Sequence, residues 1–308
     1  MSVTDSVGHS YSGRVPLVRA NFADARQAAK NLNSEEFGIM DWRYFVIQML
    51  YLVEYADYDS QSNLGQGLVF LRDGVDNIKS ANNTNEVTVR KGFDTEFIVG
   101  QQINIEKMTT PYEYIKNRTI LKMEPYLDDD AFYNGWTITF DGEPVDVNTY
   151  FDVFSKEQNS GQCDELGMNS GCLIDDGRHS VIYRGIEDIF GNVSEYIDGI
   201  NVKEGKIYIC YDPSKYVCRT YSGDYKELEI SIPDDSGYIE NIVFYENNPL
   251  IKLPGKVGEN YICDFFYNGS NNETKLSFGG NNDSKNEAGL WCFYISKGGE
   301  NGYRLLRY

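Results

Sequence analysis

The pattern of apolar and polar residues predicts two helices near the N-terminus of the chain. Residues 21–32, NFADARQAAKNL, begin with an Asn at an N-cap position and continue with good helix formers. Asp41 is placed to cap a second helix, in which apolar residues recur at helical spacing. This spacing predicts one buried stripe, and we expect both helices to pack on a sheet. The stripe consists of Trp42, Phe45, Val46, Met49, Leu50 and Val53.

From about residue 82 onward, short apolar runs with a period of two indicate strands. EVTVR (86–90) and WTITF (136–140) are two such runs, and turn residues separate them from their neighbours. We predict a small all-β insertion over residues 80–160, which leaves through the Gly- and Asn-rich loop 157–171. After Val202 the chain again alternates between strands and turns.

The stretch 183–202, YRGIEDIFGNVSEYIDGINV, combines tightly placed glycines, four acids and a single Arg. Gly185 and Gly191 are expected to need positive φ or a close approach of the backbone. An active site would need a nucleophile or a base–acid pair, and nothing nearby supplies one with a matching partner. The stretch therefore predicts a buried Arg–acid network that organises loops. The acids available to Arg184 are Glu187, Asp188 and Glu195.

The same stretch resembles the YRG-E-x-x-x-GN-x-W-E-W-x-DG signature of the formylglycine-generating-enzyme-like branch of the C-type lectin fold. Further segments are similar, in the same order, to a set of phage and prophage tail proteins. The resemblance covers residues 15–75 and 175–308, and it covers the insertion only loosely. The segments that carry it are RANFADARQAAKN (19–31), DGRH (176–179), YRGIEDIFGN (183–192), YICYDPSKY (208–216), NPLIKLPG (248–255), NEAGLWCFY (286–294) and GYRLLRY (302–308).

The resemblance implies an α+β fold, namely a C-type-lectin-like domain with an N-terminal helix pair and a small all-β insertion. Residues 1–79 would hold the helices, 80–160 the insertion and 161–308 the lectin-like domain. The two Trp positions of the signature are Ser194 and Tyr196 here, so an aromatic core contact is lost or replaced. Five residues of the signature are expected to have a structural role: Arg184, Gly185, Gly191, Asn192 and Asp198.

The last thirty residues are the expected ligand-binding surface, because this segment is exposed in relatives that resemble the phage major tropism determinant. A polar loop followed by large aromatic residues is typical of a recognition surface. For the aromatic residues, core packing is the alternative, since Trp291 and Phe293 share one face of a strand. The candidate ligand-binding residues are Asn281, Asn282, Asp283, Lys285, Asn286, Trp291, Phe293, Tyr294 and Tyr303.

Charge and hydropathy narrow the possible functions. The 308-residue chain has a net charge of −19, which argues against a nucleic-acid partner. The N-terminus lacks the apolar region of a signal peptide, and the most apolar run, residues 42–56, is too short to span a bilayer. We therefore expect a protein that is made in the cytoplasm and does not insert into a membrane.

The cysteines and acids do not predict a metal site or a cofactor. Six cysteines and two histidines show no zinc-binding spacing. Reduced thiols are expected, and local Cys163–Cys172 and Cys210–Cys218 disulfides are the alternative in an oxidising setting. The oxidases of the resembled family bind copper through paired cysteines, and Cys292 has no cysteine partner at matching spacing. Three groups of acids are interpreted as turn or surface residues and not as calcium ligands: Asp128–Asp130, Asp175–Asp176 and Asp234–Asp235.

Three functions are compatible with these features of the sequence. The first is a non-enzymatic receptor-binding protein in the tail of a phage or phage-tail-like particle. It would be a homotrimer that binds a glycan or protein of a bacterial surface and contacts other tail proteins. The second is a formylglycine-generating-type oxidase, and the third is a purely structural tail component. A minor option places carbohydrate contacts in the insertion, at Tyr126, Tyr133 and Trp136.

Overall fold

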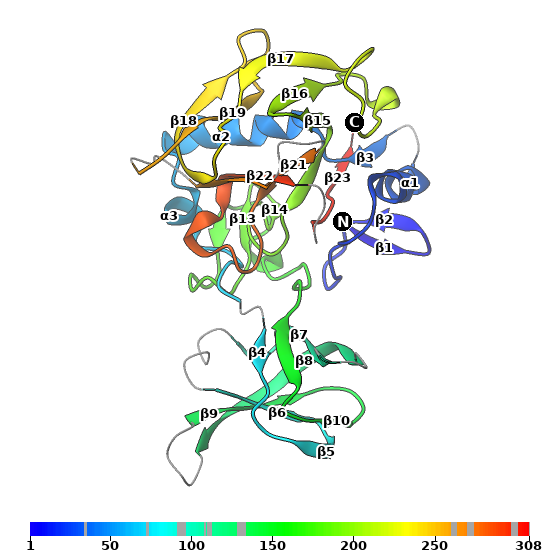
Figure 1. Ribbon diagram of the computed structural model, residues 1–308, viewed down its shortest axis with the longest axis vertical. Coiled ribbons are helices and arrows are strands. Elements are labelled where there is room, and N and C mark those ends of the chain that lie inside the picture. Colours follow the sequence, from blue (N-terminus) through cyan, green and yellow to red (C-terminus); the bar gives the residue numbers. More distant parts are fainter. Residues whose placement is uncertain are drawn as a thin grey trace. The chain divides into compact units, whose positions relative to one another are not determined.

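The chain divides into two compact units in the computed structural model (Figure 1). Unit 1 consists of Met1–Val69 and Ser160–Tyr308, and unit 2 of Phe70–Asn159. Unit 2 thus begins at residue 70, whereas the predicted insertion begins at residue 80. The structure describes residues 1–33, 36–71, 74–90, 97–107, 109, 113–127, 134–259, 264–269, 274–296 and 301–307.

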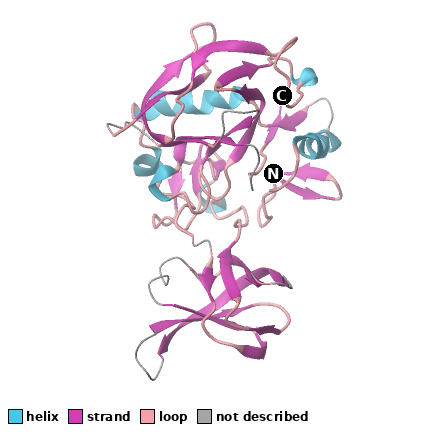
Figure 2. Ribbon diagram, viewed as in Figure 1, coloured by secondary structure: helices cyan, strands magenta, loops and turns pink. Residues whose placement is uncertain are grey.

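Strands dominate each unit, so the predicted α+β class is wrong. Of the described residues, 43 % lie in strands and only 14 % in helices (Figure 2). Both predicted helices exist, as α1 (Phe22–Leu32) and α2 (Phe45–Tyr55). The Asn21 side chain caps α1 by accepting the Asp24 N–H at 2.9 Å. Asp41 caps a 3-10 turn, η1 (Trp42–Tyr44), that leads into α2.

The two helices do not form the expected pair. Helix α1 packs on β2 (Val7–His9) and β3 (Phe37–Ile39), whereas Phe45 and Tyr51 of α2 belong to the main core. Each helix has about three turns, so it covers only a local part of a fold that strands define.

The buried face of α2 differs from the predicted stripe. Phe45, Gln48 and Tyr51 are buried, whereas Val46 and Val53 are 40 % and 81 % exposed. Gln48 tolerates burial because its Nε2 donates to the Leu290 carbonyl at 2.7 Å. The predicted stripe contained apolar residues alone and therefore left out Gln48. For this reason the predicted buried face of α2 was wrong.

The main sheet of unit 1 has eight strands and encloses the main core. Neighbouring strands are antiparallel, apart from the parallel pair β20–β22. Its spatial order is β17 (Lys226–Ser231), β16 (Lys206–Ile209), β15 (Glu195–Lys203), β21 (Thr274–Gly279), β22 (Gly289–Ser296), β20 (Phe265–Asn268), β18 (Gly237–Phe244) and β19 (Lys252–Val257).

Short elements of unit 1 bring distant parts of the chain together. Strand β23 (Leu305–Arg307) pairs with β3, and Gly302 bridges both Val18 and Glu195. The C-terminal residues therefore lie beside the N-terminal segment. The other short elements are β1 (Ser2–Thr4), α3 (Ser60–Leu64), η2 (Asp164–Leu166), β12 (Gly171–Cys172), β13 (Val181–Tyr183), β14 (Ile186–Glu187), η3 (Pro213–Lys215) and η4 (Lys285–Glu287).

A bulge in β15 changes which residues face the main core. Ile197 and Ile200 both reach that core, although they are an odd number of positions apart. Between them Gly199 has φ +75°, and a Cβ there would lie 2.7 Å from the Tyr216 ring. Asp198 accepts the Gly199 N–H at 2.8 Å and the Arg26 Nε–H at 2.6 Å. Asp198 thus ties the bulge to α1.

Unit 2 is a nearly closed sheet around its own core. An Asn77–Val89 bridge joins the two ends of the sheet. The core contains Ile103, Ile120 and Phe140, and Trp136 packs partly against it. The strand order is β4 (Val75–Asp76), β11 (Phe151–Ser155), β7 (Gln102–Lys107), β8 (Glu113–Leu127), β9 (Asn134–Phe140) and β6 (Glu86–Arg90), with a separate pair of β5 (Ala81–Thr84) and β10 (Val145–Val147).

Two predictions for unit 2 lie outside the described residues, namely those for Tyr133 and for Asp128–Asp130. Tyr126 lies on β8, where its ring is partly exposed under the Lys79 ammonium at 5.4 Å. Across both units, none of the helices in the described ranges has the length and apolar character needed to cross a bilayer.

Candidate functional site

The two glycines of the stretch 183–202 for which positive φ was predicted adopt that conformation. Gly185 has φ +79° and Gly191 has φ +78°. A Cβ on Gly191 would lie 2.8 Å from the Leu68 carbonyl oxygen, so the chain passes too close for a side chain.

An arginine network exists, but it is only half-buried and its arginine is Arg304, so the predicted Arg184 is wrong. Arg184 has φ +51° in the turn between β13 and β14, and its side chain is 49 % exposed against Glu54 of α2. The predicted acids instead surround Arg304. Its Nε donates to Glu195 Oε2 at 2.8 Å, and its Nη atoms donate to the main-chain carbonyls of Glu187 and Asp188 at 3.0 and 2.8 Å.

Asn192 connects this stretch to the polar loop near the C-terminus. Its N–H donates to the Leu68 carbonyl at 2.7 Å, and its own carbonyl accepts the Asn282 N–H at 3.2 Å. Its Nδ2 donates to Asp188 Oδ2 at 2.8 Å. One residue therefore ties two separate segments and a buried acid together, and it fixes one end of the polar loop.

The polar loop presents its side chains to solvent from a firmly held backbone. The Lys285 N–H donates to the Val69 carbonyl, and the Lys285 carbonyl accepts from Gln61 Nε2, both at 2.9 Å. The buried Ser284 hydroxyl contacts Asn281 Oδ1 and Tyr294 Oη, each at 2.9 Å. Asn281, Asp283, Lys285 and Asn286 are exposed, and Asn282 is half-buried. We call Asn281–Asn286 together with Tyr294 the terminal polar face.

Most of the aromatic candidates are core residues. Trp291 and Phe293 are fully buried and Tyr303 is 1 % exposed. Trp291 packs edge-to-face on Tyr58 at 5.1 Å, and Tyr303 contacts Phe22. Strand β22 lies inside the sheet, so the Trp291 and Phe293 rings are not available to a ligand at the surface, and the Tyr303 ring is buried in the cluster around Phe22.

Tyr294 alone among the aromatic candidates reaches the surface. It is half-buried and stacks on Tyr267, with ring centroids 4.3 Å apart and planes at 10°. Burial raises the pKa of its hydroxyl well above the usual range. The ring is thus a rigid, neutral wall beside the polar loop.

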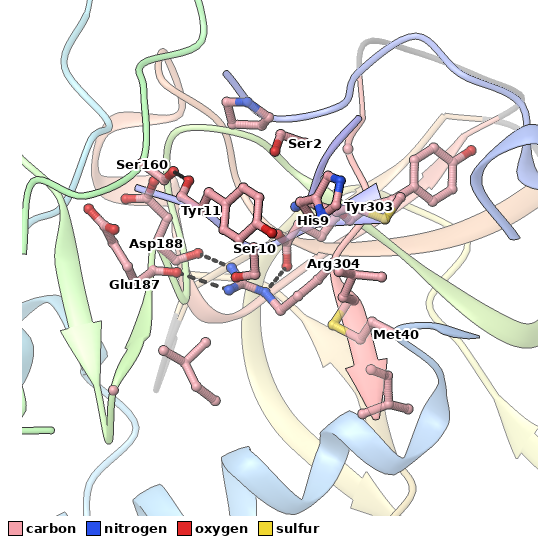
Figure 3. Close-up of a pocket in the computed structure, with 18 of the residues that line it drawn as sticks. Ser2, His9, Ser10, Tyr11, Met40, Ser160, Glu187, Asp188, Tyr303 and Arg304 are labelled. Carbon is pink, nitrogen blue, oxygen red and sulfur yellow. Dashed lines mark hydrogen bonds and ion pairs between the residues drawn. The ribbon is translucent and has the colours of Figure 1, made fainter. Parts of the chain in front are cut away.

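A concave region of about 690 Å³ surrounds Arg304 (Figure 3). We call it the Arg304 pocket. Figure 3 shows the Arg304 guanidinium pointing at the backbone of Glu187 and Asp188, with His9, Ser10 and Tyr11 among the lining residues. Apolar lining comes from Met40, Ile47 and Leu305.

The charges in the floor of the Arg304 pocket neutralise one another. Burial opposes the charge on Arg304, but Glu195 and Asp188 outweigh it and raise the pKa of the guanidinium above its usual value. Burial raises the pKa of Asp188 to about 7, repulsion from Glu187 adds to this, and the hydrogen bond from Asn192 opposes it. The Glu187 carboxylate accepts the N–H groups of Gly161 and Cys163 at 2.6 and 3.2 Å.

Ser160 fixes the outer wall of the pocket. Its Oγ donates to the Tyr11 carbonyl at 2.8 Å, its carbonyl accepts the Gly13 N–H at 2.7 Å, and its N–H donates to the Arg14 carbonyl at 3.0 Å. The Tyr11 ring stacks on His9, with centroids 4.7 Å apart and planes at 13°.

The described cysteines and acids do not gather into a metal-binding group. Among the described residues, no three His, Cys, Asp or Glu side chains are arranged to hold a metal ion. Cys163, Cys172, Cys210, Cys218 and Cys292 are all free thiols. Cys292 is fully buried in β22, and burial raises the pKa of Cys163 to about 12. Asp175 caps the Gln66 N–H at 2.7 Å, and Asp176 pairs with Arg178 and His179.

Sequence patterns did not identify Arg304, His9 and Tyr11 as site residues. They lie at opposite ends of the chain, and the pairing of β3 with β23 and the Val18–Gly302 bridge bring these ends together. No protein-family model matches the sequence, and no curated protein matches it.

Proposed function

We propose that this protein is a receptor-binding component of the tail of a phage or phage-tail-like particle. In this proposal it is made in the bacterial cytoplasm, joins other tail proteins, and binds a glycan or protein on a bacterial surface through the terminal polar face. The setting rests on the ordered sequence resemblance. The binding role is supported by the geometry of the loop.

The construction of the loop Asn281–Asn286 is the observation that carries the proposal. Hydrogen bonds to Gln61, Val69 and Asn192, which lie in two distant segments, hold its backbone. Asn281, Asp283, Lys285 and Asn286 meanwhile remain exposed. A loop that is ordered before binding loses less conformational entropy when a partner arrives, and this raises affinity.

The chemistry of the face suits recognition. It offers amide donors and acceptors, one acid and one ammonium group around the partly exposed Tyr294. Adaptable polar groups beside a rigid aromatic ring are the composition of protein recognition surfaces. A shallow face of this kind binds weakly on its own, and a homotrimer would raise the overall affinity by about 10²–10⁴ through effective concentration.

The oxidase alternative finds less support. It needs a thiol that can reach a metal or a substrate, and Cys292 is fully buried inside the main sheet. The acids that line the Arg304 pocket are also engaged, because Glu195 pairs with Arg304 and Glu187 accepts two main-chain N–H groups.

A competition assay on host cells tests the proposal. Purified protein should coat susceptible bacteria and block adsorption of the particle. The double variant Asp283→Ala with Asn286→Ala removes two exposed side chains of the face, so it should lose cell binding and keep its fold. Glu229→Ala with Ser231→Ala, also exposed but on the edge strand β17, is the matched control and should bind like the parent. Wild-type protein that does not bind cells and is absent from particles would overturn the proposal.

A further inference from the structure

We infer that the Arg304 pocket is a second binding site, for a neutral saccharide, separate from the terminal polar face. The inference extends the proposed function and does not depend on it, because the pocket and the face are built from different side chains.

The size and lining of the pocket suit a small ligand. Its volume of about 690 Å³ falls within the range of about 300–1,000 Å³ that is usual for small-molecule sites. Met40, Ile47 and Leu305 provide apolar lining, and Ser10, Ser12 and the Tyr11 hydroxyl provide polar groups. A ligand with both apolar C–H surfaces and hydroxyl groups matches this mixture.

Tyr11 provides a flat platform at the pocket. Its ring stacks on His9 at 4.7 Å, and the residue as a whole is still 58 % exposed. Ser160 holds the backbone at the Tyr11 carbonyl and at the residues that follow it, Gly13 and Arg14. The platform is therefore oriented before a ligand arrives. A pyranose ring has an apolar C–H face that packs on an aromatic ring, and its hydroxyls remain free to bond neighbouring polar groups.

The charges of the pocket favour a neutral ligand. Arg304 is paired with Glu195, and Arg43 is paired with Asp41. Arg14 and Asp164 are exposed lining residues of opposite charge. An ionic ligand would have to compete with the Arg304–Glu195 and Arg43–Asp41 pairs. A carboxylate that already accepts one hydrogen bond still has lone pairs for the hydroxyl hydrogens of a sugar, so neutral hydroxyl groups can bind without that cost.

Saturation-transfer NMR on the full chain tests the inference. The probes are glucose, galactose, mannose, rhamnose and N-acetylglucosamine, measured one at a time, with anionic N-acetylneuraminic acid for comparison. At least one neutral sugar should receive saturation at its ring protons. Tyr11→Ala should weaken its affinity about tenfold, and Tyr11→Phe should keep most of it because the stack remains.

Matched variants locate the site. Tyr150 lies in unit 2 and is 61 % exposed, so Tyr150→Ala controls for the loss of an exposed tyrosine and should leave sugar binding unchanged. The Asp283→Ala, Asn286→Ala double variant should also keep sugar binding, even where it loses cell binding.

Four outcomes would overturn the inference, and the first three are that no neutral sugar receives saturation, that Tyr11→Ala binds as well as Tyr150→Ala, and that only the anionic sugar binds. Loss of sugar binding in the double variant would assign the sugar to the terminal polar face and would also overturn it. In the first three cases the cell-binding assay is unaffected, so the proposed function can stand when this inference fails.

Discussion

The terminal polar face and the Arg304 pocket are built in opposite ways. The polar loop is one short run of residues, held through its own main chain by Gln61, Val69 and Asn192. The pocket is assembled from the N-terminal segment, the start of α2, the stretch around Glu187 and the last residues of the chain. The polar loop can be recognised in the sequence because its residues are neighbours in the chain. The Arg304 pocket cannot be recognised in this way, because its parts are not adjacent in the chain.

The largest expected effect is a difference in stability between substitutions of Arg304 and Arg184. Arg304→Met leaves the Glu195 charge and two carbonyls without their buried partner, so the free energy of unfolding should fall by about 3–5 kcal/mol. Arg184→Met removes an exposed guanidinium and should leave the midpoint of urea unfolding essentially unchanged. Equal losses in the two variants would contradict the assignment of Arg304 as the organising residue.

A smaller effect concerns the pH dependence of the pocket. The pKa of Asp188 is about 7 in the folded protein, above its ordinary value of 3.8. Between these values the folded chain holds a proton that the unfolded chain has released. Stability should therefore decrease as pH rises from about 4 to 7 and level off above, by an amount on the order of 4 kcal/mol.

Asp188→Asn is the variant that tests this window. It should flatten the profile, exceed the parent in stability at pH 8 and match it at pH 4. Urea unfolding at a series of pH values measures both proteins. If the stability of Asp188→Asn depends on pH in the same way as that of the parent, a group other than Asp188 causes the pH dependence.

The smallest effect concerns the polar loop. Ser284→Ala removes the hydroxyl that joins Asn281 to Tyr294, which should cost about 1–2 kcal/mol and increase amide hydrogen exchange over residues 281–288. Tyr294→Phe breaks only one of these contacts and should have a weaker effect on exchange. If Ser284→Ala leaves exchange and cell binding unchanged, the loop does not depend on this anchor.

Local signals predicted part of this structure correctly. The caps Asn21 and Asp41 marked where helical segments begin, and Gly185 and Gly191 have the positive φ that their setting required. These features depend on a few consecutive residues. The α+β class failed because two short helices gave clear local signals, while most of the chain forms strands.

Other predictions failed where burial depends on distant partners. The alternation in β22 could not tell a core face from a surface face, because neighbouring strands and covering elements bury both. Trp291 and Phe293 are consequently core residues. Gln48 is buried because the Leu290 carbonyl, far away in sequence, accepts its amide. Arg184 was predicted as the partner of the acids because it is close to them in sequence. Arg304, which is their partner in the structure, is far away in sequence.

The main-chain anchoring of the polar loop also has an evolutionary consequence. Asn282 and Lys285 are held through N–H and carbonyl groups that every non-proline residue possesses. Exchanging their side chains, at Lys285 for residues that tolerate its φ of +53°, would therefore alter the chemistry presented to a partner while preserving the path of the chain. Substitutions on such a surface would change which partner it binds, and they would not require compensating substitutions in the hydrophobic core.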